Sequence, residues 1–196
     1  MIDSSFEKHT ERLILRLYRE TDYEMWRETY STLPKPKNRW DNGPKPLEKL
    51  TVGGFNKTLA NQEKDSSEDK FYCLNAFEKD SGQLIGQCSL MDISRVIFQN
   101  TYLGYVIYSP CWRKGYGKEA VSAMFDVAFN TLKLHRVEAG IEPNNKRSIA
   151  LAKSFNMRRE GLSKRRLFYR DEWVDMIIYA ITVEDLGLKA LPANPV

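Results

Sequence analysis

Hydrophobic and polar positions in the first third of the chain predict one strand and two helices. Three leucines alternate with polar residues over 10–17, as in a half-buried strand. A capping-box spacing at 21–24 predicts the start of a helix, which must end by Leu33 because a proline-rich loop follows. A second helix is expected over 47–62. The polar segment 64–69 after it is interpreted as a surface loop.

The rest of the chain switches between strand-like and helical patterns. A turn at Asp80-Ser81-Gly82 separates two apolar runs and predicts a hairpin, and Asn156 stands where a helix is expected to end. The predicted strands cover 71–77, 83–91, 101–108, 136–141, 163–169 and 173–182, and the predicted helices cover 117–132 and 146–155.

This order of elements predicts an α/β fold with a mixed, mostly antiparallel central sheet flanked by helices. The helix between the strands at 101–108 and 136–141 implies one parallel strand-helix-strand crossover. The 196 residues suit a single domain. Within it we expect 34–69 to be a variable insertion of helix and loop, and 187–196 to be a tail.

Composition places the chain among globular proteins and excludes several classes. Hydrophobic residues make up 42% of the chain and charged residues 29%, which is typical of a folded domain rather than a disordered one. No apolar run is long enough to span a membrane, and the first residues lack a signal-peptide pattern, so a cytoplasmic protein is expected. The net charge of +4 suits an anionic ligand and RNA equally.

The cysteines predict neither a disulfide framework nor a metal site. Cys73, Cys88 and Cys111 are odd in number, widely spaced and without a histidine cluster. Cys73 and Cys88 alternate with apolar residues, so we expect both to be buried in strands.

The segment between the strand at 101–108 and the helix at 117–132 carries the strongest chemical signal. It reads Arg113-Lys114-Gly115-Tyr116-Gly117-Lys118. The free N–H groups and the positive dipole end of the following helix suit a phosphate, and the two glycines let the backbone approach it closely. Arg113, Lys114 and Lys118 add positive charge. The loop is therefore predicted to bind a ligand with at least one phosphate, in our interpretation a diphosphate.

Other phosphate-binding motifs fit this loop less well. A P-loop would need a Gly-Lys-Ser/Thr sequence, which is absent. The spacing from Gly115 to Ala120, with Glu138 further on, matches a dinucleotide-binding fingerprint. Against it, Pro110 to Lys114 separate the glycines from the strand, and too little chain follows for a doubly wound sheet. An ordinary loop with two turn glycines is the third hypothesis.

Short motifs recur along the chain at 10–16, 84–86, 103–105, 112–120, 145–149, 159–161 and 173–175. Taken in this order, they resemble the GNAT acetyltransferases, and within them the RimJ/RimL-like ribosomal-protein N-acetyltransferase branch. The chain departs from the usual pattern at Trp112, where such loops open with Gln or Arg, and at Asn156-Met157, where Gly-Phe is usual.

The resemblance implies that acetyl-CoA is the cofactor and that an acetyl group passes to an amine. Val106 and Ile107 would hold the pantetheine arm and polarise the thioester through their backbone groups, and residues 113–118 would bind the diphosphate. Asn145 would order the site and contact the cofactor. Ser148 would donate a proton to the leaving thiolate. The simpler interpretation of Asn145 and Ser148 is helix capping and a satisfied hydroxyl.

The general base, the acceptor and the oligomeric state stay open at the level of sequence. Glu142, Tyr102 or a water molecule could accept the amine proton. The acceptor is expected to be a small-molecule amine or the α-amine of a protein or peptide N-terminus, and a ribosomal protein is one such partner. A monomer or a homodimer is expected. The alternative function is a non-catalytic sensor that binds acyl-CoA.

Overall fold

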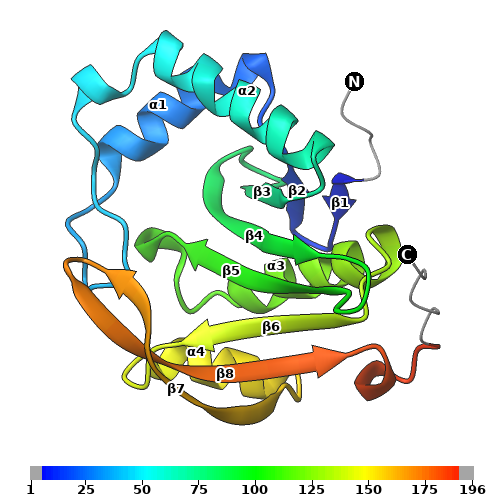
Figure 1. Cartoon of the computed structure of the whole chain (residues 1–196). Coiled ribbons are helices and arrows are strands. Elements are labelled where there is room, and N and C mark those ends of the chain that lie inside the picture. The colour runs from blue at the N-terminus through cyan, green and yellow to red at the C-terminus, as the bar shows by residue number, and fades with distance from the viewer. Residues whose placement is uncertain (1–5, 190–196) are drawn as a thin grey trace.

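A mixed eight-stranded sheet runs through the protein, and helices cover both of its faces (Figure 1). The computed structural model describes residues 6–189, so most of the predicted tail at 187–196 lies outside the described residues. Across the sheet the strands follow the order β1-β2-β3-β4-β5-β6-β8-β7. The strands are β1 (Lys8–His9), β2 (Leu13–Arg16), β3 (Phe71–Glu78), β4 (Leu84–Ser94), β5 (Asn100–Ile107), β6 (Arg136–Ile141), β7 (Arg158–Tyr169) and β8 (Glu172–Thr182).

Strand pairing confirms the predicted fold class. Each neighbouring pair is antiparallel except β5 and β6, which run parallel. The connection from β5 to β6 contains a helix, as a parallel crossover requires. The hairpin at 80–82 also forms, with Gly82 in a left-handed conformation at φ 70°.

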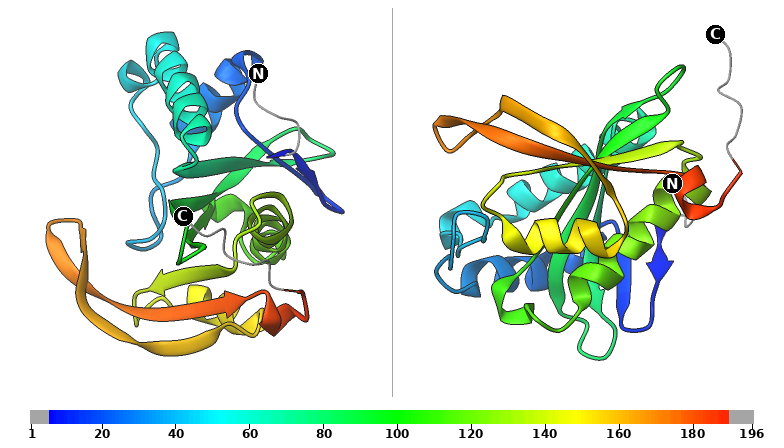
Figure 2. Two further views of the ribbon diagram at one scale, coloured as in Figure 1. Left: turned by 45° about the vertical axis from the view of Figure 1, so that its right-hand side comes forward. Right: turned by 90° about the horizontal axis from the view of Figure 1, so that it is seen from below.

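The helices form one layer on each face of the sheet (Figures 1 and 2). On one face, α1 and α2 cover an aromatic-rich cluster. On the other, α3 and α4 cover the main apolar core. The α-helices are α1 (Tyr23–Thr32), α2 (Val52–Ser67), α3 (Tyr116–Asp126) and α4 (Lys146–Ser154). Short 3-10 turns occupy Glu20–Asp22, Leu47–Lys49, Ser109–Cys111 and Glu184–Leu186, and α3 continues into a π-helical turn over Val127–Thr131.

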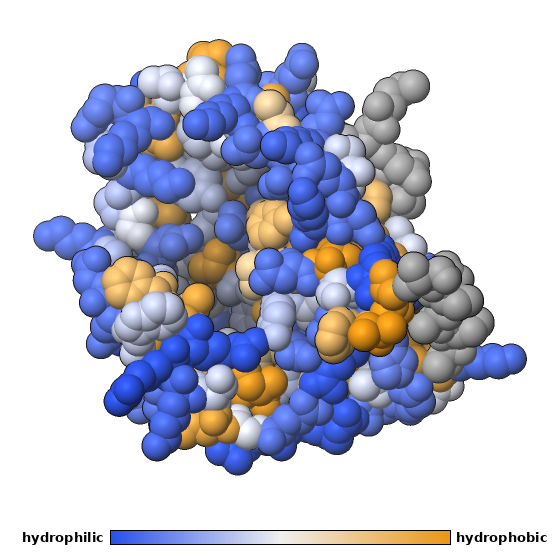
Figure 3. Space-filling model, in the orientation of Figure 1, coloured by the Kyte–Doolittle hydropathy of each residue, from blue (hydrophilic) through white to orange (hydrophobic). Residues whose placement is uncertain are grey.

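The loop 33–46 leaves the end of α1 and descends to the tip of the β7–β8 hairpin (Figure 1). The surface between the α1–α2 layer, this loop and the hairpin is hollowed (Figure 3). Within residues 6–189, none of the helices has both the length and the apolar character needed to cross a membrane.

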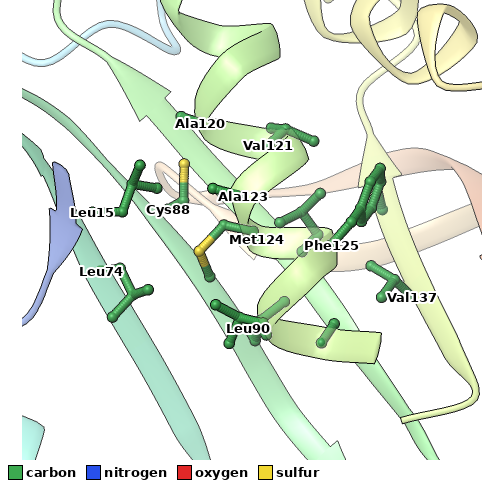
Figure 4. Close-up of a cluster of buried hydrophobic side chains, with 14 of the residues drawn as sticks. Leu15, Leu74, Cys88, Leu90, Ala120, Val121, Ala123, Met124, Phe125 and Val137 are labelled. Carbon is green, nitrogen blue, oxygen red and sulfur yellow. The ribbon is translucent and has the colours of Figure 1, made fainter. Parts of the chain in front are cut away.

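The main core lies between α3 and the central strands (Figure 4). Val121, Met124 and Phe125 recur at helical spacing and are almost fully buried against the sheet. Leu15, from β2, is also fully buried there, which confirms the alternation predicted for the first strand. Among the predicted strand cysteines, Cys88 is buried and Cys73 half-buried.

The first helix was predicted within its observed bounds, since α1 begins at Tyr23 and ends before Leu33, but the second helix was wrong at both ends. At the start of α1 the predicted capping box does not form: Asp22 is the N-cap residue, without a side-chain cap, and its carboxylate accepts hydrogen bonds from Arg16 and from the backbone N–H of Arg19. The second helix begins at Val52, because the Thr51 hydroxyl caps it by accepting from Gly54 N at 3.1 Å. It also continues to Ser67, so most of the polar segment 64–69 is helix rather than loop.

Candidate active site

β5 and β6 pair at one end only and then separate. Their register runs from Asn100↔Arg136 to Tyr102↔Glu138 and ends there, while β5 stays paired with β4. The Tyr108 N–H, just beyond β5, donates to Ile85 O at 2.9 Å on the β4 side. Since backbone groups alternate in direction along a strand, those of Ile107 and Tyr105 face the opening between β5 and β6. The backbone groups of Val106 face β4 instead, so the expectation that Val106 acts through its backbone was wrong, and Tyr105 takes that place beside Ile107.

A cavity of about 240 Å³ lies at this opening and extends to the start of α3. Most of the predicted site residues line it: Val106, Ile107, Arg113, Gly115, Tyr116, Gly117, Asn145 and Ser148. The other lining residues are Asn38, Trp40, Tyr105, Cys111, Trp112, Arg147 and Leu151.

Lys114 and Lys118 do not line this cavity. The backbone carbonyl of Lys114 accepts a hydrogen bond from Arg12 at 2.8 Å. Lys118 lies on a neighbouring hollow of about 630 Å³, where its amine is 6.0 Å from the centre of the Phe155 ring. The structure therefore brings together the glycines and Arg113 but not the two lysines.

The glycine loop has the geometry expected for binding an anion at a helix start. Gly115 is the N-cap residue of α3 and has φ 85°, a conformation that favours glycine. Glu119 in the first turn of α3 accepts the backbone N–H of Arg12 at 2.7 Å and its guanidinium Nε at 2.8 Å. Arg12, in the segment before β2, is thus hydrogen-bonded to the first turn of α3 and ties the glycine loop to the sheet.

Two hydroxyl groups from residues that line the cavity contact each other. The Tyr105 hydroxyl and the Ser148 Oγ lie 2.6 Å apart. Burial raises the pKa of Tyr105 to about 12, although the bond to Ser148 acts in the opposite direction. Tyr105 therefore stays protonated at neutral pH. Sequence reasoning missed its role; the available signal was its alternation with Ile107 along the strand.

Asn145 caps α4 and positions Ser148. Its side-chain oxygen accepts the backbone N–H of Ser148 at 3.2 Å. This is the helix-capping role considered in the sequence analysis, and both side chains also line the cavity. The cap therefore sets the start of α4 at the point where Ser148 reaches Tyr105.

Trp112 closes the end of β5. Its indole N–H donates to Ile107 O at 2.6 Å, so it satisfies a carbonyl that faces the opening. The Arg147 guanidinium carbon lies 4.2 Å from the centre of its ring, and the Lys37 amine lies 5.4 Å from it. Trp112, which departs from the usual loop sequence, thus contacts both α4, through Arg147, and the segment 33–46, through Lys37.

The two candidate bases are both engaged by other groups. Glu142 accepts the Trp40 indole N–H at 2.7 Å and lies 3.5 Å from the Arg39 guanidinium, and its side chain is 11% exposed. The Tyr102 hydroxyl accepts a hydrogen bond from Arg166. Burial, and then the charge of nearby Glu138, raise the pKa of Tyr102.

Comparisons with known proteins point to an acetyltransferase. The acetyltransferase (GNAT) domain family matches residues 12–158. The probable N-acetyltransferase YjcK of Bacillus subtilis is 32% identical over 135 residues, which cover 69% of this chain and 75% of YjcK. The ribosomal protein uS5-alanine N-acetyltransferase of Escherichia coli is 26% identical and covers 90% of both chains. RimJ of Mycobacterium smegmatis, in complex with CoA-disulfide, shares the fold, with a TM-score of 0.74 and 22% identity over 91% of this chain and 85% of RimJ.

Proposed function

The chain belongs to the GNAT acetyltransferase family, and on that premise we propose that it transfers the acetyl group of acetyl-CoA to the α-amine of a protein N-terminus. The observation that carries the proposal is the cavity between β5 and β6. The α3 start, with its free N–H groups and glycines, and the hydrogen-bonded hydroxyls of Tyr105 and Ser148 both line it. A thioester cofactor with a diphosphate needs both an anion-binding helix start and a proton donor for its thiolate.

The cavity wall suits the cofactor in chemistry as well as in shape. Val106 and Ile107 offer apolar side chains, and the backbone N–H groups on the open edge of β5 can donate to the pantetheine arm and the thioester oxygen. The α3 start with Gly115 and Gly117 receives the diphosphate. Arg113 faces this group, and Lys114 and Lys118 add positive potential from behind.

Ser148 and Tyr105 act on the leaving group. With acetyl-CoA bound, bond formation between the amine nitrogen and the acetyl carbon and cleavage of the carbon–sulfur bond would place negative charge on the sulfur. Ser148 would donate its proton to that sulfur and take one from Tyr105, whose phenol is protonated at working pH. The nitrogen would release a proton to water as it becomes an amide, and Tyr105 would regain one from water, so the products are the amide and the CoA thiol. Asn145 supports the step by holding the α4 start in place.

The engagement of Glu142 favours an α-amine as the acceptor. A lysine side chain, with a pKa of about 10.4, needs a strong base to become neutral, whereas an α-amine at about 7.7–8.0 needs little help. Glu142 is held by Trp40 and Arg39, so it is poorly placed to remove a proton. An α-amine can lose its proton to water and attack without a dedicated base.

A thiol-release assay with three acceptors tests the proposal. The first is a peptide with a free alanine N-terminus, chosen from the uS5-alanine relative. The second is the same peptide with a blocked N-terminus and one lysine, and the third is a polyamine. We expect CoA release and one added acetyl group with the first peptide only. Release with the polyamine or the blocked peptide would overturn the α-amine assignment, and binding of acetyl-CoA without release with any amine would support a non-catalytic sensor.

A further inference from the structure

Two positively charged side chains from distant segments lie against the indole ring of Trp112. Arg147 comes from the first turn of α4 and Lys37 from the loop 33–46. We infer that Arg147, stacked on Trp112, binds the diphosphate of acetyl-CoA. The inference rests on the proposed function and assigns a residue that the glycine loop does not contain.

Trp112 provides a fixed platform for these cations. Its indole N–H is bonded to Ile107 O at 2.6 Å, so the ring cannot turn without breaking a hydrogen bond at the cavity wall. The Arg147 guanidinium, 4.2 Å from the ring centre, is within the range of a cation–π interaction. A planar guanidinium stacked in this way keeps its edge N–H groups free for a ligand.

Neither cation is neutralised by the protein. Among residues 6–189, no carboxylate lies within ion-pair distance of Arg147 or Lys37, whereas Arg12, Arg16 and Arg39 all have acidic partners. Arg147 also lines the cavity together with Arg113. A cavity that gathers unpaired guanidinium groups beside two helix starts favours an anion with several oxygen atoms.

The placement of the loop lysines strengthens this assignment. Lys114 and Lys118 do not line the cavity, so the loop itself supplies only Arg113 as a cation there. Trp112 carries no charge of its own, yet its ring holds Arg147, which lines the same cavity as Arg113. A diphosphate has two negatively charged groups to satisfy. Arg113 and Arg147 therefore supply two positive charges to the lining of one cavity.

Calorimetric titration of Arg147→Ala with three ligands tests the inference. The ligands are acetyl-CoA, 3′-dephospho-acetyl-CoA and S-acetyl-pantetheine, which has no phosphate. Lys146→Ala is the matched control, because it removes the same charge from the adjacent position of α4 without touching the Trp112 ring or the cavity. Arg147→Lys keeps the charge but loses the planar guanidinium.

We expect Arg147→Ala to weaken acetyl-CoA and the 3′-dephospho compound equally, by about tenfold. S-acetyl-pantetheine should bind the variant and the parent alike. Arg147→Lys should recover part of the loss, and Lys146→Ala should change little.

Three results would overturn the inference. If Arg147→Ala lowers the affinity for acetyl-CoA but not for the 3′-dephospho compound, Arg147 contacts the 3′-phosphate rather than the diphosphate. Equal losses in Arg147→Ala and Lys146→Ala would mean a general charge effect. Unchanged affinity in Arg147→Ala would remove it from the site. These differ from failure of the proposed function, in which the parent protein itself would not bind acetyl-CoA.

Discussion

At the scale of single residues, the proposed chemistry depends on the hydrogen bond between Tyr105 and Ser148. Asn145 and Ser148 were singled out by the family resemblance, whereas their place at a predicted helix start alone indicates capping. Tyr105 was not singled out, although it alternates with Ile107, because its contact with Ser148 depends on which side of β5 faces α4. The contacts of Trp40 with Glu142 and of Arg147 with Trp112 could not be predicted, because the partners lie far apart in the sequence.

Removing the Ser148 hydroxyl should lower turnover without changing cofactor affinity. In Ser148→Ala we expect kcat to fall by about 100-fold, the lower range for loss of a proton donor, while Kd for acetyl-CoA stays within about twofold. Ser154→Ala is the control, because its hydroxyl lies in the same helix and bonds only to Leu151 O. Steady-state kinetics and calorimetry measure the two quantities. An unchanged kcat in Ser148→Ala would exclude Ser148 as the donor.

The raised pKa of Tyr105 makes a prediction about alkaline pH. Burial favours the neutral phenol, so Tyr105 should stay protonated up to about pH 12. The rate kcat/KM should therefore rise through about pH 8 as the acceptor α-amine loses its proton, and then stay level to about pH 10.5. If the parent protein loses activity between pH 9 and 10 and Tyr105→Phe does not, the raised pKa of the Tyr105 phenol would be contradicted.

Gly117 tests the diphosphate loop directly. A Cβ atom at Gly117 would meet only ordinary contacts with Ile107 and Leu151, so Gly117→Asp should fold. Its carboxylate would stand at the helix start that receives the diphosphate, and we expect acetyl-CoA binding to be lost. Gly161→Asp adds the same charge in open space on β7 and should bind normally. A retained affinity in Gly117→Asp would place the diphosphate elsewhere.

At the scale of elements, strands with one buried face were predicted well and exposed elements poorly. β6 was placed at its observed bounds, because its residues alternate between the core and the opposite face. The start of β7 was missed, since this edge strand is exposed along most of its length and shows no alternation. The end of α2 was missed because a helix exposed to solvent can carry the same polar residues as a loop.

The loop 33–46 connects the cofactor cavity to the β7–β8 hairpin. Lys37 reaches Trp112, while Arg39 pairs with Glu172 at 2.7 Å and accepts the Tyr169 hydroxyl on its backbone oxygen at 3.0 Å. Nothing in the order of the sequence predicts these contacts, because a proline-rich loop carries no periodic pattern. The loop therefore stands where cofactor and acceptor would meet.

Cofactor binding should protect this loop from trypsin. The cleavable positions are Lys37 and Arg39, because Lys35 and Lys45 each precede a proline. Asn38 and Trp40 line the cavity, so saturating acetyl-CoA should slow cleavage at both positions, since the loop opens less often. Mass spectrometry of the fragments identifies the cuts. Unchanged cleavage under saturating acetyl-CoA would contradict binding of the cofactor against this loop.

At the scale of the whole molecule, the site exists because the two halves of one sheet separate at β5 and β6. The half from β1 to β5 holds α1 to α3, and the half from β6 to β8 holds α4 and the hairpin. Sequence order predicted the parallel crossover that joins them. It could not predict where the pairing stops, because this depends on how far the twisted halves stay in contact.

The central claim is that this opening binds acetyl-CoA. A calorimetric titration of the purified protein with acetyl-CoA, with NAD and ATP titrated alongside, tests it most directly. We expect one site per chain with a Kd on the order of micromolar for acetyl-CoA and no heat of binding for NAD or ATP. Binding of NAD in preference to acetyl-CoA, or no binding of acetyl-CoA, would contradict the assignment of the cavity between β5 and β6.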